Sequence, residues 1–285
     1  MEIFRTSAEL RQWSRAVRCE VGDKVGNAMG LVPTMGALHQ GHASLIRAAA
    51  ASCGQVAVSI FVNPTQFGPS EDYARYPRTF DADCALARAA GATAIFAPAV
   101  EELYPGGAVT FVEVGELSDR LDGKSRPGHF RGVATVVSKL LIAAEADRAY
   151  FGQKDAAQVS VIRRMVADLR FATQIVVCPI VRERDGLALS SRNAYLSPVE
   201  RAQALTLSRA VRRVEALVAQ GERRAGALIK AAQAEFAAEP AVRVDYVELV
   251  DWATLLPVEG AAPKTLFAVA AFVGATRLID NTIIT

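Results

Sequence analysis

Two kinds of hydrophobic pattern alternate along the first part of the chain. Short apolar runs rich in β-branched residues predict strands, and longer stretches with apolar residues three or four positions apart predict helices. The expected strands are 28–33, 55–62, 93–97, 148–151 and 173–178, and the expected helices are 43–51, 81–90, 132–144 and 156–169. The run Gln55–Val62 carries no charge, as is typical of a strand in a sheet that is covered on both faces. This alternation predicts a doubly wound, parallel α/β sheet.

The pattern changes after about residue 185. Ser197, Pro198 and Glu200 make a helix-start signature, with proline at the first helical position and an acid three residues after the cap. Two helices rich in Ala, Arg and Leu follow, to about residue 238, and then three strand-like runs at 242–250, 266–272 and 276–284. We therefore expect a catalytic α/β domain at 1–185 and a smaller C-terminal α+β domain at 186–285.

Composition and charge exclude several classes of protein. The 285 residues are 51% hydrophobic and 22% charged, which is typical of a soluble globular chain. A net charge of only +2 argues against nucleic acid or an anionic membrane as the main partner. The N-terminus does not resemble a signal peptide, and the apolar stretch Leu266–Ala275 is too short to span a bilayer. Four cysteines without a C-x-x-C pair predict reduced, mostly buried thiols, and we expect a cytoplasmic protein.

The main chemical signal lies between the expected strand 28–33 and the helix that follows it. The string PTMGALHQGH places His39 and His42 where the chain leaves a strand and enters a helix. Ligands of open α/β sheets collect beyond the carboxyl ends of the strands, and free N–H groups at a helix start attract phosphate. Both imidazoles can donate hydrogen bonds to phosphate. The bland alternative is a pair of helix-cap or surface histidines, and H-x-x-H without a nearby acid or cysteine is weak evidence for a metal site.

Four further polar segments occur in or near expected loops. The first extends from Gln66, which follows the strand 55–62 as a donor and acceptor amide or as part of an ordinary turn, to Asp81 and Asp83. These two acids begin the next helix, as a solvated helix start or a metal contact. The basic loop 126–132 is either part of a site or a flexible surface loop. Lys154 is a mobile point charge suited to phosphate, unless it is a surface lysine beside a helix cap. The last segment, 187–193, brings two hydroxyls and a guanidinium that suit a polyphosphate, with a surface turn as the alternative.

The motif H-x-G-H resembles the HIGH motif of the nucleotidylyltransferase superfamily. The longer string PTMGALHQGH, supported by the four further segments, is similar to the pantothenate synthetase (pantoate–β-alanine ligase) family. The resemblance implies a Rossmann-like domain that activates pantoate with ATP as an acyl-adenylate and passes it to β-alanine, releasing AMP and pyrophosphate. It also implies Mg²⁺ with the ATP phosphates, a C-terminal domain that closes over the site, and a homodimer. A nucleotidyltransferase of the same fold, acting on a phosphate acceptor, is the alternative.

The resemblance also assigns roles to residues. The catalytic residues that it implies are His39, His42 and Lys154. The ATP-binding residues are Met35, Gly36, Ala37, Leu38, His39, Gln40, Gly41, His42, Gly152, Gln153, Lys154, Asp155, Val181, Leu189, Ser190, Ser191 and Arg192. Pantoate and β-alanine are assigned to Gln66, Gln158 and Phe130. No direct metal ligand is expected, with Asp83 as the one candidate.

Overall fold

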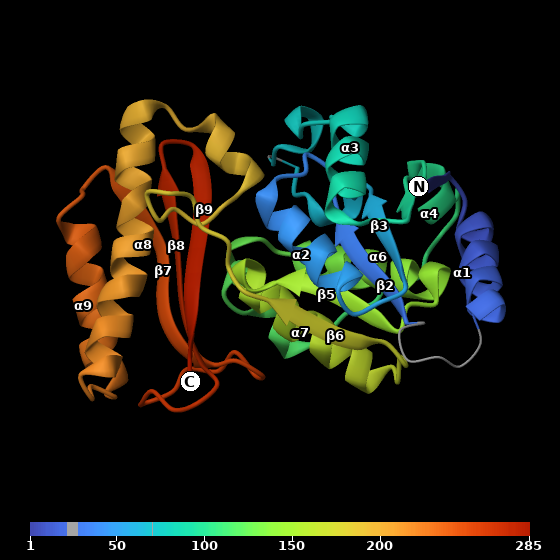
Figure 1. Ribbon diagram of the computed structural model, residues 1–285. Helices are drawn as coiled ribbons and strands as arrows, with labels where there is room; N and C mark the ends of the chain where they lie inside the picture. Colours follow the sequence, from blue (N-terminus) through green and yellow to red (C-terminus); the bar gives the residue numbers. More distant parts are fainter. Residues whose placement is uncertain (22–27, 70) are drawn as a thin grey trace. The chain divides into compact units, whose positions relative to one another are not determined.

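The computed structural model describes residues 1–21, 28–69 and 71–285 in two compact units, with the side chains of residues 19–21 outside the description (Figure 1). The first unit comprises 1–119, 126–152 and 161–178, and the second comprises 120–125, 153–160 and 179–285. The chain therefore passes into the second unit twice before its C-terminal part.

The first unit is built on a six-stranded sheet, and every strand pairs in parallel with its neighbours. Its strands run in the order β1-β4-β3-β2-β5-β6. They are β1 (Glu2–Phe4), β2 (Met29–Thr34), β3 (Gln55–Ile60), β4 (Ala94–Phe96), β5 (Arg148–Gly152) and β6 (Gln174–Cys178). The α/β class expected from the sequence is thus confirmed, and β1 is an edge strand that the pattern does not predict.

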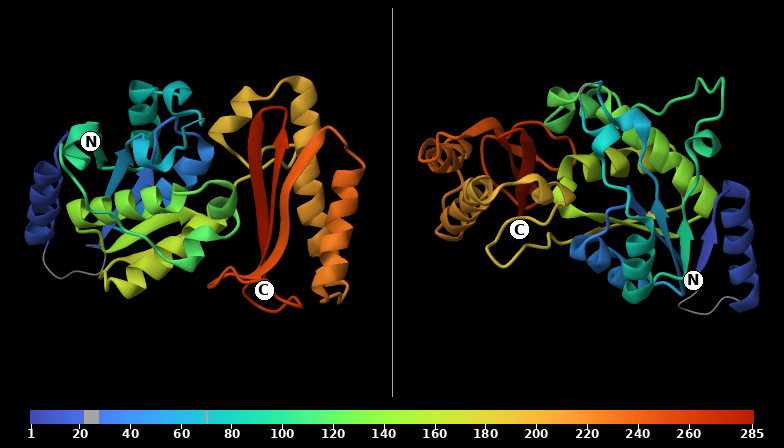
Figure 2. Two further views of the ribbon diagram at one scale, coloured as in Figure 1. Left: turned by 180° about the vertical axis from the view of Figure 1, so that it is seen from behind. Right: turned by 90° about the horizontal axis from the view of Figure 1, so that it is seen from above.

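Helices cover both faces of this sheet. They are α1 (Ser7–Val21), α2 (Gln40–Ala50), α3 (Phe80–Ala90), α4 (Val100–Leu103), α6 (His129–Ala144) and α7 (Ala156–Asp168), whose first turn is assigned to the second unit. Helices α2 and α3 pack together on one face, and α1 and α6 pack together on the other (Figure 2). Val32, Val58 and Ile95 of the sheet form a buried core with Ile46 of α2 and Ala87 of α3.

Short 3-10 turns and the short helix α5 lie between the longer elements of the two units. They are η1 (Pro64–Gln66), η2 (Tyr73–Arg75), η3 (Glu116–Asp119), α5 (Asp122–Ser125), η4 (Gln153–Asp155) and η5 (Ser191–Tyr195). The first of these comes shortly after β3, and η4 comes directly after β5. The carboxyl ends of the central strands therefore lead into the segments that the sequence singles out.

The second unit packs two long helices against a three-stranded antiparallel sheet. Helices α8 (Pro198–Ala219) and α9 (Ala225–Ala237) lie against β7 (Val242–Asp251), β8 (Thr265–Val273) and β9 (Thr276–Ile284). The helix start predicted at Ser197 is confirmed: its side chain accepts the Glu200 N–H, and the Glu200 carboxylate accepts the Ser197 N–H. Thus the smaller α+β unit expected from the sequence has the predicted order of helices and strands.

A buried ionic cluster explains why the segment 120–125 belongs to the second unit. The Arg277 guanidinium of β9 lies 2.7 Å from the Asp122 carboxylate and 2.8 Å from that of Asp245. Ser125 donates a hydrogen bond to Asp245 as well. Tyr246 is enclosed beside them, and burial raises the pKa of its phenol. Charges that are paired in this way hold α5 against β7 and β9.

Three of the four cysteines lie among the described side chains, as free thiols. Cys53 and Cys178 are buried, Cys84 is half-buried, and the side chain of Cys19 lies outside the described residues. Within 1–21, 28–69 and 71–285, none of the helices has the length and apolar character needed to cross a bilayer.

Candidate functional site

The histidine turn, residues 35–39, joins β2 to α2 in the first unit. Its backbone takes the left-handed conformation at Gly36 (φ +84°) and at Ala37 (φ +50°), which reverses the chain before the helix. Glycine adopts that conformation freely, whereas alanine does so only where surrounding contacts hold it. The Gly36 N–H donates to the Thr34 hydroxyl at 3.1 Å, which closes the turn onto the end of β2.

Both histidines take part in starting α2. His39 is the N-cap, and its Nδ1 accepts the Gly41 N–H at 3.1 Å. The His39 N–H donates in turn to Nδ1 of His42 at 3.3 Å, and the two ring centroids are 4.1 Å apart. A nitrogen that accepts a hydrogen bond carries no proton, so this geometry calls for the neutral tautomer with the proton on Nε2. Each ring is thus a cap through Nδ1 and a donor through Nε2.

Asp83 fixes the same turn from α3. Its carboxylate is 2% exposed and accepts the N–H groups of Ala37 (3.0 Å) and Leu38 (2.7 Å). The interpretation of Asp83 as part of a solvated helix start is therefore wrong, although Asp81 is exposed. The N–H groups of Ala37 and Leu38 are also directed to a carboxylate, so only other atoms of these two residues can serve the ATP role that the family resemblance implies for them.

Gln66 lies in η1, the turn that follows β3. Its side chain is 9% exposed, its Oε1 accepts from the Asn63 amide at 3.0 Å, and its Nε2 contacts Sδ of Met35 at 3.0 Å. The structure thus brings Gln66 to the histidine turn. Asn63 also donates to the Gly132 carbonyl at 3.1 Å, and a Cβ at Gly132 would lie 2.3 Å from the Thr65 oxygen. These contacts between Gly132 and the turn at Asn63 and Thr65 cannot be predicted from the sequence, because they connect segments that are far apart in the chain.

The basic segment 126–132 folds onto the same region of the first unit, and it is a loop only up to Gly128, because residues 129–132 form the first turn of α6. Arg126 binds the Glu71 carboxylate with two hydrogen bonds of 2.7 and 2.6 Å. Burial by itself would raise the pKa of Glu71, but these bonds and the charge of Arg126 outweigh it and hold the pKa below its ordinary value of 4.5. His129 contacts the Gln66 carbonyl through Nδ1 at 2.8 Å. The loop is therefore held in place by an ion pair. Phe130 is 2% exposed, and its role toward pantoate stays a prediction.

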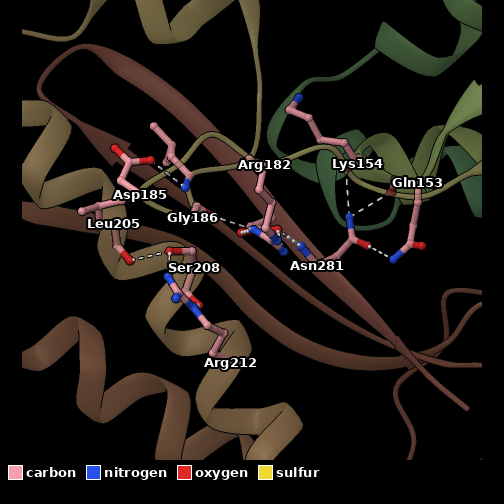
Figure 3. Close-up of polar contacts among 12 residues, drawn as sticks. Gln153, Lys154, Arg182, Asp185, Gly186, Leu205, Ser208, Arg212 and Asn281 are labelled. Atoms are coloured by element: carbon pink, nitrogen blue, oxygen red, sulfur yellow. Dashed lines mark hydrogen bonds and ion pairs between the residues drawn. The ribbon is translucent and has the colours of Figure 1, made fainter. Parts of the chain in front are cut away.

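The second unit holds the lysine segment that follows β5. The Asn281 amide of β9 donates to the carbonyls of Gln153 (3.0 Å) and Lys154 (2.9 Å), and Gln153 donates back to Asn281 at 3.2 Å. The Lys154 side chain points away from Asn281 (Figure 3). Its ammonium lies 3.6 Å from the Asp155 carboxylate. Asn281 is 3% exposed, and sequence reasoning misses it. Gln158 lies half-buried in the first turn of α7.

The second polar segment of this unit is a hairpin-like loop. The Leu189 N–H donates to the Val181 carbonyl at 2.9 Å, which brings these two predicted ATP contacts together. Ser190 caps η5 by accepting the Arg192 N–H at 3.3 Å, and Ser190, Ser191 and Arg192 are all half-buried. The hydroxyls and the guanidinium thus sit on one short turn.

An ion pair anchors the base of this loop. Arg182 binds Asp280 with two hydrogen bonds of 2.7 and 2.9 Å, and the Asp280 side chain is 2% exposed. Gly186 (φ +97°) turns the loop where a Cβ would lie 2.5 Å from the Arg212 guanidinium. The segment that precedes Ser190 is therefore a turn that side-chain contacts hold in place. Whether this turn binds a polyphosphate or is a surface turn without a ligand stays a prediction.

Comparisons with known proteins agree on one family. The family model described as pantoate-beta-alanine ligase matches residues 2–283. The chain is 59% identical over 290 residues to the pantothenate synthetase of Acidobacterium capsulatum, covering 100% of this chain and 97% of that protein. It is 55% identical over 284 residues to the pantothenate synthetase of Koribacter versatilis, covering 100% and 96%.

Solved structures give the same result. The crystal structure of pantothenate synthetase from Thermus thermophilus is similar with a TM-score of 0.92 and 45% identity, over 99% of each chain. The ligase of Francisella tularensis, solved with β,γ-ATP and β-alanine, has a TM-score of 0.79 and 32% identity, over 99% of this chain and 97% of that one. This chain therefore belongs to the pantoate–β-alanine ligase family.

Proposed function

We propose that the protein condenses (R)-pantoate with β-alanine to form pantothenate, using ATP and passing through a pantoyl-adenylate. The observation that carries this proposal is the pair of imidazoles at the start of α2, each oriented through Nδ1 so that Nε2 is the donor. That arrangement suits an oxygen-rich, negatively charged reactant at the end of a central strand. The relatives support a ligase over the alternative, a nucleotidyltransferase acting on a phosphate.

The first step makes a mixed anhydride. A carboxylate oxygen of pantoate attacks the α-phosphorus of ATP, the bond from that phosphorus to the β-phosphate oxygen breaks, and pyrophosphate leaves. Negative charge grows on the phosphate oxygens during this step. His39 and His42 supply N–H donors to those oxygens, and a preoriented donor of this kind is worth about 10²–10³ in rate.

The second unit supplies further donors in this proposal. Lys154 contributes positive charge, with Gln153 and Asp155 as its neighbours in the nucleotide segment, which Gly152 at the end of β5 in the first unit precedes. Ser190, Ser191 and Arg192 donate to the polyphosphate, with Val181 and Leu189 beside the nucleotide. We propose that the smaller unit closes over bound ATP, because the anhydride hydrolyses if water reaches it.

The second step forms the amide bond. The amine of β-alanine attacks the pantoyl carbonyl, AMP leaves with the anhydride oxygen, and the amine loses a proton. Gln66 and Gln158 hold pantoate through amides that both donate and accept. Gln66 is suited to this task because Asn63 and Met35 fix its orientation. Phe130 is buried in the first turn of α6.

Mg²⁺ enters this proposal with the ATP phosphates, whose charge it neutralises. The protein residues do not favour a separate site: both oxygens of Asp83 already accept backbone N–H groups. Among residues 1–21, 28–69 and 71–285, no group of three or more His, Cys, Asp or Glu side chains is arranged to hold a metal ion. We also propose a homodimer in the cytoplasm, as the family resemblance implies.

Pyrophosphate exchange tests the proposal. Labelled pyrophosphate should enter ATP when pantoate and Mg²⁺ are present and β-alanine is absent, because the first step is reversible before the amine arrives. Adding β-alanine should divert the intermediate to pantothenate and AMP. Exchange that ignores pantoate, or ADP as the product, would refute the acyl-adenylate mechanism.

A further inference from the structure

The Asp83 carboxylate is buried among neutral donors. It accepts the N–H of Ala37 with Oδ2, and the N–H of Leu38 and the Thr79 hydroxyl (3.1 Å) with Oδ1. With an exposed fraction of 2%, it has little water to solvate it. No ion pair of Asp83 is found among the described residues. A buried carboxylate that is compensated only by hydrogen bonds must hold those donors tightly, because losing one leaves charge unsolvated.

The donors belong to the strained part of the histidine turn. Ala37 sits at φ +50°, a conformation that is unfavourable for a non-glycine residue unless other contacts compensate. Hydrogen bonds to a charged acceptor are stronger than neutral ones. The two bonds to Asp83 therefore hold the backbone at Ala37 and Leu38, directly before the N-cap His39.

The position of the turn determines where both imidazoles lie. His39 follows Leu38 in the chain, and its backbone N–H orients His42. A shift of the turn would thus move both rings together, and misplacement of catalytic groups by about 1 Å can cost about 10²-fold in rate.

We propose that Asp83 is a positioning residue of the adenylylation step, which acts through the histidine turn and touches neither substrate nor metal. The proposal rests on the proposed function, since it concerns the same reaction. It assigns to α3 a task in catalysis: its buried first-turn carboxylate sets the direction of two donors that lie 46 and 45 residues earlier in the chain.

Asp83→Asn tests the proposal, because the amide keeps the shape but replaces one acceptor by a donor that faces a backbone N–H. In pantoate-dependent pyrophosphate exchange, we expect kcat to fall by about 10²-fold while KM for pantoate changes less than about twofold. The matched control is Asp81→Asn, which makes the same substitution at an exposed acid in the same helical turn and should leave both constants unchanged.

A double-mutant cycle separates positioning from general damage. If Asp83 acts through the histidines, Asp83→Asn should cost much less in a His42→Ala background than in the wild type. A purely structural role would give effects that multiply. Independent, multiplying effects, or wild-type kcat in folded Asp83→Asn, would overturn the proposal. A requirement for more Mg²⁺, with kcat restored at saturating Mg²⁺, would make Asp83 a metal ligand and overturn it as well.

Thr79→Val provides a second route if Asp83→Asn does not fold. It removes only the hydroxyl that orients Oδ1, at an exposed position. We expect kcat to fall by about two- to fivefold with unchanged KM, since a single neutral donor to the carboxylate is lost. An unchanged kcat would count against the proposal. Wild-type enzyme without pantoate-dependent exchange would instead refute the proposed function and leave the Asp83 geometry unexplained.

Discussion

His39 and His42 together cap one helix: the His39 N–H donates to Nδ1 of His42, while Nδ1 of His39 accepts the Gly41 N–H. This is the capping-box arrangement made with two imidazoles in place of a hydroxyl and a carboxylate. The rings are therefore fixed before any ligand arrives, and they are neutral in this arrangement. The transition state would meet two oriented donors, which is a different role from the imidazolium charge that a histidine pair also suggests.

Substitutions of His39 can separate its structural role as the N-cap of α2 from its proposed role as a hydrogen-bond donor to phosphate. His39→Ala should cost about 1 kcal/mol in the free energy of unfolding, measured by urea denaturation, because the cap is lost. It should also lower kcat by about 10²–10³-fold. Asn is a good N-cap, so His39→Asn should restore stability but leave kcat low. Wild-type turnover in His39→Asn would show that His39 is only a cap.

Replacing His42 tests the other ring. His42→Ala should lower kcat by about 10²–10³-fold in pyrophosphate exchange, since a donor to the phosphate oxygens is removed. The loss of stability should stay within about 1 kcal/mol, because the His42 side chain lies outside the core and contributes one bond to the cap. Near wild-type exchange in both histidine variants would remove the turn from the reaction.

Gln66→Ala and Gln158→Ala should weaken pantoate binding much more than ATP binding, as measured by the two KM values under otherwise saturating conditions. The reason is that each removes an amide proposed to hold pantoate. Gln220→Ala, an exposed glutamine at the end of α8, is the matched control and should change neither value. An increase confined to the KM for ATP would place these glutamines on the nucleotide side.

Lys154→Ala should strongly depress pyrophosphate exchange, because it removes a positive charge from phosphates in a site shielded from water. The matched control is Lys230→Ala, which removes the same charge from an exposed position of α9 in the same unit and should leave exchange unchanged. Asn281→Ala should give a milder loss, since it frees the carbonyls of Gln153 and Lys154 that fix the segment. Equal exchange in the Lys154 and Lys230 variants would contradict the assignment.

Acid should weaken the contact between Glu71 and Arg126. The pKa of Glu71 lies below its ordinary value of 4.5 in the folded protein. The ionised carboxylate therefore contributes to the free energy of unfolding at pH values above 4.5, and this contribution is lost as the pH falls through the pKa of the folded state. An NMR titration of the Glu71 carboxyl should give a midpoint below 4.5, and Arg126→Gln should raise it. A midpoint that Arg126→Gln leaves unchanged would show that the ion pair does not form in solution.

Most of the fold follows from local information. Periodicity predicts most of the long strands and helices to within a few residues, because a covered strand and an amphipathic helix each leave a pattern in their own residues. The long helix α1 (Ser7–Val21) is an exception, since it is absent from the elements expected from the sequence. The helix start at Ser197 is predictable for the same reason. The strand β1 is not, since its three residues (Glu2–Phe4) are too few to carry a pattern and only pairing with β4 makes them a strand.

The histidine turn can also be predicted from the sequence, because His39 and His42 are three residues apart and the hydrogen bond between them is local. The contacts that hold the turn are not predictable in this way, because Asp83 lies 46 residues from Ala37. The same is true of the lysine segment, since Asn281 lies 127 residues from Lys154. No periodicity connects such pairs. A carboxylate or an amide at a helix start or in a strand looks the same in sequence whether it faces water or a buried backbone group. Only the packing of α3 against α2 and of β9 beside η4 decides which, because burial makes a hydrogen-bond partner obligatory and the tertiary fold supplies it.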